Sequence, residues 1–493
     1  VDFAPVETIV QIGGPKGVAR FIQRAGRSGH RPGAASTIYF LPVNSLELIE
    51  AAALRQAIHD NYVEAREPLQ LCFDVLVQYL VTLSAGDGFD ASITYEEIKN
   101  THCFHQLTGE EWKWILRFTA HGGTSLNRYD EYKRISLMNG LYHISNQRIA
   151  RRHRMGIGTI VSDTLMAVRI ARGGLLGHVE ESFMASLHVG DHFWFAGMSL
   201  ELVRTKELTA TVKKSDKRTG RSPAWQGGRL ALTSRMSDML RIKMTEAAAL
   251  LNNRRKKADP ELKKILPLIA LQKQRSHVPS ADEFLIESFV TDDGHHLVLY
   301  PFEGILVHEG LAALIAYRIG RTMPVSFSLA YNDYGLELLS EFPVAPELLL
   351  DKKMYGTTNL EQDILQGVNA TELARRKFRD IAAIAGLVFK GYPGQPVRDR
   401  HLQSSSSLIF QVFEDYDPHN LLLRQAYDEV VNYQLEMPRL RTALERIGDQ
   451  QIIIAKSEKP TPFSFPIITD RLRERMSSEE LTKRIERMTV DYA

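Results

Sequence analysis

Cysteine, long apolar runs and net charge are all scarce in this sequence of 493 residues. It has only two cysteines, Cys72 and Cys103, which excludes a disulfide framework and favours a reducing cytoplasm. No apolar run reaches the roughly 18 residues of a membrane helix, so we expect no membrane partner. The 61 lysines and arginines nearly balance the 59 aspartates and glutamates, so the net charge of +2 indicates no partner. With 44% hydrophobic and 24% charged residues, the composition excludes a collagen-like or disordered chain.

The sequence also lacks the two motifs that hold ATP and magnesium in nucleotide hydrolases. A P-loop has the form Gly-x-x-x-x-Gly-Lys-Ser/Thr, because backbone amides and a lysine must surround the phosphates. The sequence contains no Gly-Lys dipeptide and no Asp-Glu-x-His box. We therefore predict that this polypeptide does not hydrolyse ATP alone and binds no cofactor of its own. Its first residues, Val1-Asp2-Phe3, include no initiator methionine, so we expect it to be the remainder of a longer protein.

The opening segment has the pattern of part of an α/β domain. Residues 6–12 and 36–41 are mostly apolar and predict two strands, and residues 16–25 between them have helical spacing. This order favours a parallel sheet, and one such unit is too small to enclose a core. The helix ends in the basic run QRAGRSGH, residues 23–30, where glycines would let arginines approach a polyphosphate. From the residues alone, a solvated basic helix end is the favoured alternative.

The next segment predicts a winged helix. A first helical pattern is followed by a second at residues 110–120, which a capping box at residues 108–111 opens. Asn139-Gly140 then joins the β-type runs 132–137 and 141–145, and this dipeptide is a strong hairpin signal. Helix, helix and hairpin is the order of elements in a winged helix.

A basic run follows the predicted wing directly, at Arg148, Arg151, Arg152, His153 and Arg154. Basic residues beside a wing commonly contact the nucleic-acid backbone. We therefore predict that Arg151, Arg152 and Arg154 bind nucleic acid. A winged helix that only spaces two domains is an equally good interpretation of the same residues.

Short β-type runs separated by glycines follow, and they predict a small β-barrel or sheet. The runs cover residues 165–170, 178–187, 192–195, 199–204 and 209–213. Between residues 204 and 229 there are eight basic residues and only two acidic ones. Lys213, Lys214 and Arg221 in this stretch are therefore predicted to bind nucleic acid. Trp225, in a basic loop with glycines, suits base stacking on a single strand, and the alternative is an aromatic plug folded against the barrel.

The C-terminal half predicts a mixed α/β domain from about residue 284 onward. Its predicted elements are a strand at residues 297–300 and helices at residues 311–319, 371–385, 421–435 and 439–448. His295, His296, His308 and Glu309 resemble a metal cluster. Adjacent residues on a strand point to opposite faces, however, so we predict no metal site.

Two further patterns in this half bear on function and local structure. Glu414, Asp415 and Asp417 would suit a two-metal nuclease or hydrolase. Their grouping before a proline is, however, typical of a turn. Residues 404–407, four consecutive serines, predict a short flexible loop.

The run GGPKGVARFIQRAGRSGHRPG resembles motif VI of superfamily-2 helicases, in the form seen in Lhr-type (large helicase-related) DExH helicases. The resemblance implies that this segment belongs to the second RecA-like domain. It also implies that Gln23 and Arg24 line a nucleotide cleft and that Arg27 is the arginine finger that reaches the γ-phosphate of ATP. His30 stands where many members of the superfamily carry a second arginine, although Lhr-type sequences share the histidine. Whether Arg31 substitutes for that arginine is open.

The resemblance extends over essentially the whole chain. Val1-Asp2-Phe3 resembles the end of motif V, which places the start of the chain between motifs V and VI. PAWQGGRLALTS resembles the Pro-x-Trp-x-Gly motif of Lhr-type helicases, whose tryptophan, here Trp225, stacks on the tracked strand. HHLVLYPFEGILVHEGLAALIAYRIG and PTPFSFPIITDRLRERMSSEEL resemble the ligase-associated branch of the family, which implies a DEAD/H-associated accessory region that clamps the strand.

Together these patterns predict a multidomain α/β and α+β protein. The expected domains are a RecA-like remnant (1–58), a winged helix (59–154), a basic β-rich module (155–251) and an accessory α/β domain (252–493). The resemblance implies the gripping half of an ATP-dependent helicase that moves 3′ to 5′ on single-stranded DNA in DNA repair. It also implies ATP and magnesium bound mostly outside this segment, action on RNA–DNA hybrids, DNA ligase and nuclease partners, and a cytoplasmic, nucleoid-associated location. The alternative is a non-catalytic nucleic-acid-binding or assembly module.

Overall fold

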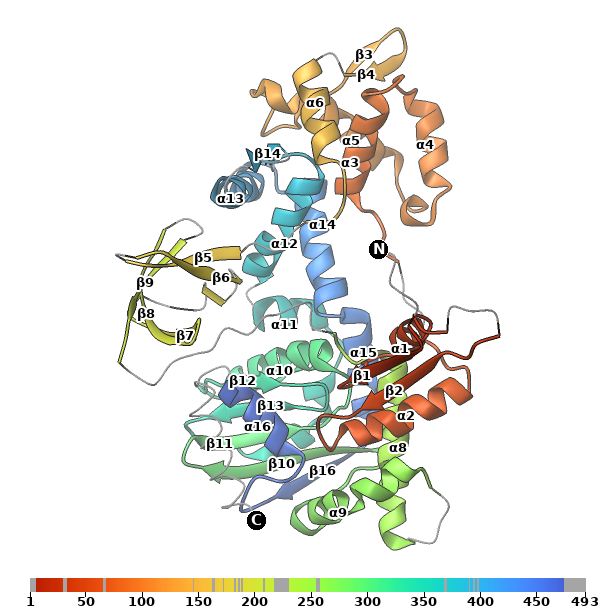
Figure 1. Ribbon diagram of the computed structural model, residues 1–493, viewed down its shortest axis with the longest axis vertical. Helices are drawn as coiled ribbons and strands as arrows, with labels where there is room; N and C mark the ends of the chain where they lie inside the picture. The colour runs from red at the N-terminus through yellow and green to blue at the C-terminus, as the bar shows by residue number, and fades with distance from the viewer. Residues whose placement is uncertain are drawn as a thin grey trace. The chain divides into compact units, whose positions relative to one another are not determined.

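The structure is a computed structural model, shown in Figure 1. It describes residues 6–29, 33–64, 68–144, 146–161, 165–171, 173–180, 183–184, 187, 189–206, 209–216, 230–253, 258–367, 370–389, 391–392, 395–396 and 399–473. The chain divides into two compact units, each assembled from segments far apart in the sequence. The first unit comprises residues 1–65, 217–368 and 435–493, and the second comprises residues 66–216 and 369–434. No helix within the described ranges is long and apolar enough to span a bilayer.

The opening segment is a parallel strand–helix–strand unit, as predicted. Strand β1 (Thr8–Ile12) pairs in parallel with β2 (Thr37–Leu41), and helix α1 (Val18–Ala25) connects them. Helix α1 starts later than predicted because Lys16 adopts a left-handed backbone conformation, with φ 63°. Helix α2 (Glu47–His59) follows β2.

Helix α2 packs against α8 (Ser234–Asn252) and α9 (Pro260–Arg275) in the core of the first unit. Its side chains Ala52, Ala53 and Ala57 are fully buried, and such small residues let neighbouring helices approach closely. The apolar side chains of these three helices form one continuous cluster with those of the sheet described next.

The first unit also contains a five-stranded sheet in the order β12–β13–β11–β10–β16. Its strands are β10 (Glu283–Thr291), β11 (Gly294–Leu299), β12 (Ser328–Tyr331), β13 (Leu336–Ser340) and β16 (Gln451–Lys456). Neighbouring strands are antiparallel except for β10 and β16, which are parallel. All five residues of β13 are buried, so both faces of the sheet are covered at this strand.

Helices surround this sheet. They are α10 (Ile305–Gly320), α11 (Leu360–Gly367), α15 (Met437–Asp449) and α16 (Ser464–Arg473). Both α10 and α16 contact β12 and β13, while α11 and α15 pack on α10. The mixed α/β character predicted for this part of the chain is confirmed.

The second unit begins with a winged helix, as predicted. Its elements are α3 (Phe73–Ser84), α4 (Ala91–Lys99), α5 (Gly109–His121), and the hairpin of β3 (Ser136–Met138) and β4 (Leu141–His143). The predicted capping box is present, since the Thr108 hydroxyl accepts from the Glu111 N–H at 3.2 Å and the Glu111 carboxylate accepts from the Thr108 N–H at 3.0 Å. Asn139 and Gly140 both have positive φ, as this hairpin turn requires.

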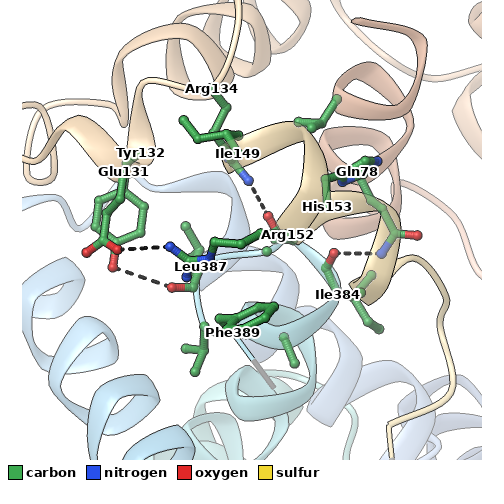
Figure 2. A pocket seen from close by; sticks show the side chains of 16 residues that line it. Gln78, Glu131, Tyr132, Arg134, Ile149, Arg152, His153, Ile384, Leu387 and Phe389 are labelled. Atoms are coloured by element: carbon green, nitrogen blue, oxygen red, sulfur yellow. Dashed lines mark hydrogen bonds and ion pairs between the residues drawn. The ribbon is translucent and has the colours of Figure 1, made fainter. Parts of the chain in front are cut away.

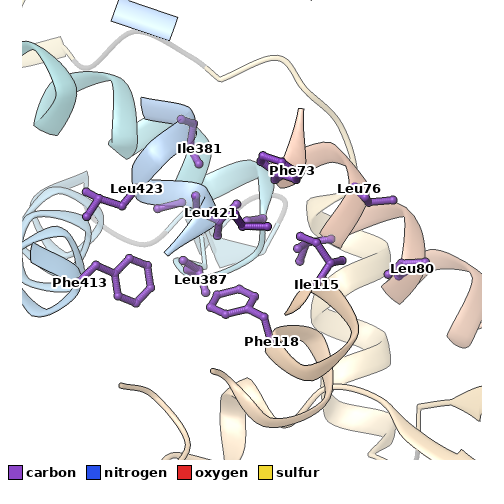
Figure 3. Close-up of a cluster of buried hydrophobic side chains, with 14 of the residues drawn as sticks. Phe73, Leu76, Leu80, Ile115, Phe118, Ile381, Leu387, Phe413, Leu421 and Leu423 are labelled. Carbon is purple, nitrogen blue, oxygen red and sulfur yellow. The ribbon is translucent and has the colours of Figure 1, made fainter. Parts of the chain in front are cut away.

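The winged helix shares its core with helices from much later in the chain (Figure 3). These are α12 (Ala370–Ile384), α13 (Asp399–Tyr416) and α14 (Leu421–Glu429). Phe118 of α5 meets Phe413 of α13 edge to face at 6.3 Å, and both rings are buried. Buried aromatic pairs of this kind stabilise the contact beyond the area that they bury.

A five-stranded sheet completes the second unit, in the order β6–β5–β9–β8–β7. Its strands are β5 (Leu165–Ile170), β6 (Leu175–Glu180), β7 (His192–Phe195), β8 (Met198–Lys206) and β9 (Thr209–Lys214). The pair β5–β9 is parallel and the other pairs are antiparallel. Four of the five predicted runs coincide with strands, while β6 starts and ends earlier than its run.

Two local predictions in the second unit are wrong. Residues 404–407 lie inside α13 and form no loop, and Glu414 and Asp415 lie in the last turn of the same helix. Serine is a moderate helix former, and the apolar residues that follow supply a buried face that includes Phe410 and Phe413. Tertiary packing therefore outweighs the local preference of the serines for a loop.

Candidate nucleotide and nucleic-acid contact sites

The residues predicted to contact nucleotide or nucleic acid lie in three places within the described structure. Gln23, Arg24 and Arg27 are at the end of α1 in the first unit, whereas the second unit carries the basic helix after the wing and the lysines of β9. Arg221 and Trp225 lie outside the described residues. The structure therefore brings Gln23, Arg24 and Arg27 together with one another, and Arg151, Arg152 and Arg154 together on one helix.

The end of α1 exposes two of its three predicted side chains. Gln23 and Arg27 are exposed, while Arg24 is half-buried and donates to the side-chain carbonyl of Gln11 on β1. The segment after the helix is fixed by Ser28, whose hydroxyl donates to the Ala25 carbonyl at 2.8 Å and accepts from the Thr37 N–H at 3.0 Å. Arg27 thus stands on a short segment that is tied to both α1 and β2.

Gly29 makes this tight return possible. Its φ of +69° lies in the left-handed region, and a Cβ at this position would lie 2.9 Å from the Ala35 carbonyl oxygen. No other residue type fits here without moving the backbone. Gly29 of the QRAGRSGH run is thus required by the backbone conformation of the segment that carries Arg27.

The other end of α1 is anchored by a buried ion network around Lys16. The Lys16 ammonium lies 2.7 Å from Glu50 of α2 and 3.1 Å from Asp333, which follows β12. Asp333 also accepts from the N–H groups of Leu232 and Ile305, each at 3.1 Å, and Ile305 is the first residue of α10. Burial would lower the pKa of Lys16, but the two carboxylates raise it well above its usual value.

Helix α6 (Gln147–Gly156) carries the basic run after the wing. Asn146 caps it by accepting from the Arg148 N–H at 2.9 Å. Arg148, Arg151 and Arg154 are exposed on successive turns, and Arg154 donates to the Ala85 carbonyl at 2.7 Å. Three exposed arginines therefore follow the wing hairpin.

Arg152 lies differently from its neighbours on α6. Its guanidinium lies 3.4 Å from the Glu131 carboxylate and stacks over the Phe389 ring at 4.7 Å. It is half-buried and turned toward the body of the second unit. Its predicted role in binding nucleic acid stays a prediction, and the structure gives it contacts within the protein.

The lysines of β9 are both exposed at the end of that strand. Lys213 pairs with Glu201 of the neighbouring strand β8 at 2.8 Å. Lys214 lies opposite Leu200 in the register of the two strands. Because surface pairs of this kind are weak, Lys213 could exchange its carboxylate for a phosphate at small cost.

The histidines considered for a metal site are held by protein groups. His296 on β11 contacts Glu337 at 2.6 Å through Nδ1 and Thr291 at 2.7 Å through Nε2. His308 accepts from the Glu303 N–H at 2.9 Å and donates to the Asn332 carbonyl. In the part of the chain that the structure describes, no group of three or more metal-binding side chains comes together.

The carboxylates considered for a nuclease also have separate partners. Glu414 accepts from the Tyr427 hydroxyl at 2.8 Å, Asp415 from the Gln411 amide at 3.0 Å, and Asp417 from the Asn420 amide at 2.9 Å. Because each carboxylate is bonded to a different side chain, the structure gives the nuclease interpretation no support.

Two family models match the chain. The large helicase-related protein winged helix domain matches residues 56–222, and the DEAD/H associated domain matches residues 278–464. The chain is 23% identical to the ATP-dependent helicase Lhr-Core of Methanocaldococcus jannaschii, over 98% of the chain and 57% of that protein. It is 24% identical to the protein of the same name from Sulfolobus acidocaldarius, over all of the chain and 58% of that protein.

A solved structure has the same fold. It is that of Mycobacterium smegmatis helicase Lhr bound to ssDNA and AMP-PNP, with a TM-score of 0.70 at 20% identity. The match covers 94% of this chain and 56% of the other. The chain thus spans a little more than half the length of these proteins.

Proposed function

Because the chain belongs to the Lhr-type (large helicase-related) family, we propose that it is the nucleic-acid-gripping part of an ATP-dependent helicase. Its proposed substrate is single-stranded DNA, along which the intact enzyme moves 3′ to 5′ to unwind DNA or RNA–DNA duplexes in DNA repair. The solved relative was bound to single-stranded DNA, which supports this substrate. DNA ligase and nuclease partners and a nucleoid-associated location belong to the same proposal.

The exposed basic face of α6 is the observation that carries the proposal. Arg148, Arg151 and Arg154 are exposed residues directly after a wing hairpin, and the Arg154 guanidinium also donates to the Ala85 carbonyl. Guanidinium groups bind phosphate oxygens with several donors at once, and such contacts position a protein on a strand. Lys214 and, from the sequence, Arg221 and Trp225 would extend the grip with phosphate contacts and base stacking.

We propose that the residues at the end of α1 contact the nucleotide. Gln23, Arg24 and Arg27 offer N–H donors from one short segment, and none of the three is a carboxylate. This donor set suits the phosphates of ATP and not magnesium, which prefers oxygen ligands. When ATP is bound, Arg27 would stabilise the charge that develops on the transferred phosphate.

Salt-dependent binding to a fluorescent single strand tests the grip. We expect Arg151→Ala/Arg154→Ala to weaken affinity at least about tenfold and to reduce the salt slope by about 1.4, as two lost phosphate contacts predict. Lys263→Ala/Lys264→Ala removes two exposed charges from α9 and is the matched control. If both double variants bind like the unaltered protein, α6 does not contact the strand.

The nucleotide role needs the intact enzyme. With the upstream half restored, Arg27→Ala should lower DNA-stimulated ATP hydrolysis by about a thousandfold, the scale of a lost arginine finger. Strand binding should persist, because Arg27 lies on a different segment from α6. Unchanged turnover would favour a passive assembly module instead.

A further inference from the structure

A pocket in the second unit lies where the winged helix meets the end of α12 (Figure 2). Its cavity volume is about 70 Å³, and it is partly open to solvent. Its charged and polar lining consists of Gln78, Glu131, Tyr132, Arg134, Arg152 and His153. The opposite wall is the backbone of residues 383–389, which ends helix α12.

Arg134 is the most deeply buried charged group of this lining, with 6% of its surface exposed. Figure 2 shows its side chain reaching into the pocket, where one terminal nitrogen donates to the Ala385 carbonyl. Gly386, with φ +69°, lies beside this nitrogen, and a Cβ there would make an ordinary contact with it at 3.4 Å. The C-terminal end of α12 is a favourable place for a cation.

The helix end leaves part of the guanidinium unpaired. Nε and Nη2 of Arg134 are buried and have no hydrogen-bond partner among the residues that the structure describes. No carboxylate from those residues lies within 4 Å of this side chain. Burial lowers the pKa of Arg134 to about 10, so the group is still charged at neutral pH. A buried, uncompensated cation is costly, and such groups are usually paired.

The rest of the charged and polar lining carries no net charge, so nothing in it balances Arg134. Arg152 and Glu131 neutralise each other at 3.4 Å, the single ion pair of the described lining. Burial and the charges of Arg134 and Arg154 lower the pKa of His153 to about 4, so this ring is neutral at pH 7. The Tyr132 hydroxyl adds a donor, which now makes a long contact of 3.4 Å to the Leu387 carbonyl.

We propose that this pocket binds a phosphate-class oxyanion through the guanidinium groups of Arg134 and Arg152. An oxyanion with several oxygens can accept from both fork-shaped groups at once and supply the missing negative charge. Since Nε and Nη2 are shielded from solvent, the lining must rearrange to admit it. Exposed Glu131 is the group to be displaced, because its contact with Arg152 is long.

Two sources supply this chemistry, namely free inorganic phosphate and a phosphate of a bound strand. The inference goes beyond the proposed function, because inorganic phosphate alone would satisfy it. Only the possibility that the ligand is a phosphate of a bound strand rests on the proposed function. Calorimetric titration with phosphate therefore comes first, at constant ionic strength set by chloride.

We expect saturable binding of one phosphate per chain, weakened at least about tenfold by Arg134→Met, which keeps the aliphatic stem and loses every donor. Arg128→Met removes an exposed arginine from the same unit and should bind like the unaltered protein. Absence of saturable binding by the unaltered chain overturns the proposal, as does equal affinity in Arg134→Met. If Arg134→Met does not fold, Arg152→Met takes its place under the same criteria.

Competition then distinguishes the two sources. If a strand phosphate occupies the pocket, a saturating oligonucleotide should abolish the phosphate heat, and Arg134→Met should weaken strand binding. If the heat persists with the strand bound, the ligand is free phosphate. Failure of phosphate to bind refutes the pocket alone, whereas unchanged strand binding in the α6 double variant refutes the proposed grip alone.

Discussion

Glu303 in the first unit and Arg134 in the second are equally buried ions with very different surroundings, at 5% and 6% exposure. Three guanidinium groups contact the Glu303 carboxylate, those of Arg241 at 2.6 Å, Arg446 at 3.0 Å and Arg439 at 3.4 Å. Burial alone would raise the pKa of Glu303, but these arginines hold it below its usual range. Arg134 contacts no carboxylate among the described residues, and its guanidinium has one carbonyl at a helix end and the Phe118 ring at 5.9 Å.

This difference distinguishes charges that stabilise the fold from a charge that is available to bind a ligand. Around Glu303, ion pairs join α8 and α15 to the segment that precedes α10, so this network links three parts of the first unit. Every arginine in it has a carboxylate partner within the chain, although Nε of Arg439 and Nε of Arg446 have no hydrogen-bond partner among the described residues. Arg134 has no carboxylate partner among the described residues, and its missing partner is best sought outside the protein.

The largest effect is expected from Glu303→Gln, which leaves three guanidinium groups without the carboxylate between them. The free energy of unfolding should fall by about 3–5 kcal/mol, as for other broken buried ion pairs. Urea denaturation measures it. The control is Glu347→Gln, which removes a surface carboxylate that pairs with Lys456 at 2.7 Å, and it should leave the midpoint unchanged. Equal midpoints in both variants would show that the Glu303 network does not hold the unit together.

A somewhat smaller loss is expected when Lys16 is removed from its network. Lys16→Met leaves the buried Glu50 carboxylate unpaired and should cost about 3 kcal/mol. Because Glu50→Gln removes that charge, the double variant should lose less than the sum of the two single variants. Strict additivity in denaturation experiments would show that the two groups are not coupled.

The surroundings of Lys16 also show which features of the fold can be predicted from the sequence and which cannot. The strand–helix–strand order around it, the hairpin at Asn139 and Gly140, and the capping box of Thr108 were predictable because each depends on neighbours in the chain. The partners of Lys16 are Glu50 and Asp333, which only the fold brings to it. No local pattern marks such a network.

The same limit applies to the candidate sites. Arg27, Arg151 and Arg154 belong to basic runs that the sequence displays, and they are exposed, but their roles remain predictions. Arg152 belongs to the same basic run, yet its contacts with Glu131 and Phe389 come from other segments. Nothing in the sequence marks Arg134, since a single arginine beside a hairpin predicts neither its burial nor the absence of a carboxylate partner.

Acid should weaken the first unit through His308. Its Nε2 accepts from the Glu303 N–H and its Nδ1–H donates to the Asn332 carbonyl, so the fold requires the neutral ring. Burial lowers the pKa of His308 to about 4, against about 6.5 for an unfolded chain. Its contribution is therefore complete above pH 6.5 and falls by about 3 kcal/mol as the pH drops to 4. Denaturation of His308→Gln should show a shallower loss over this range, and parallel curves would exclude His308 as the cause.

Asp74 in the second unit should respond to acid in the opposite direction, with an effect of about 2–3 kcal/mol. Burial raises the pKa of this α3 carboxyl to about 6, although its bonds with Gln425 and Val75 act against the rise. The folded chain thus binds a proton that the unfolded chain releases between pH 4 and 6, so the stability of this unit falls as pH rises through that range. Asp74→Asn keeps an oxygen that accepts the Gln425 amide at 2.8 Å and cannot ionise. Its free energy of unfolding should match that of the unaltered protein near pH 4 and exceed it at pH 7, and a difference that does not change with pH would refute the assignment.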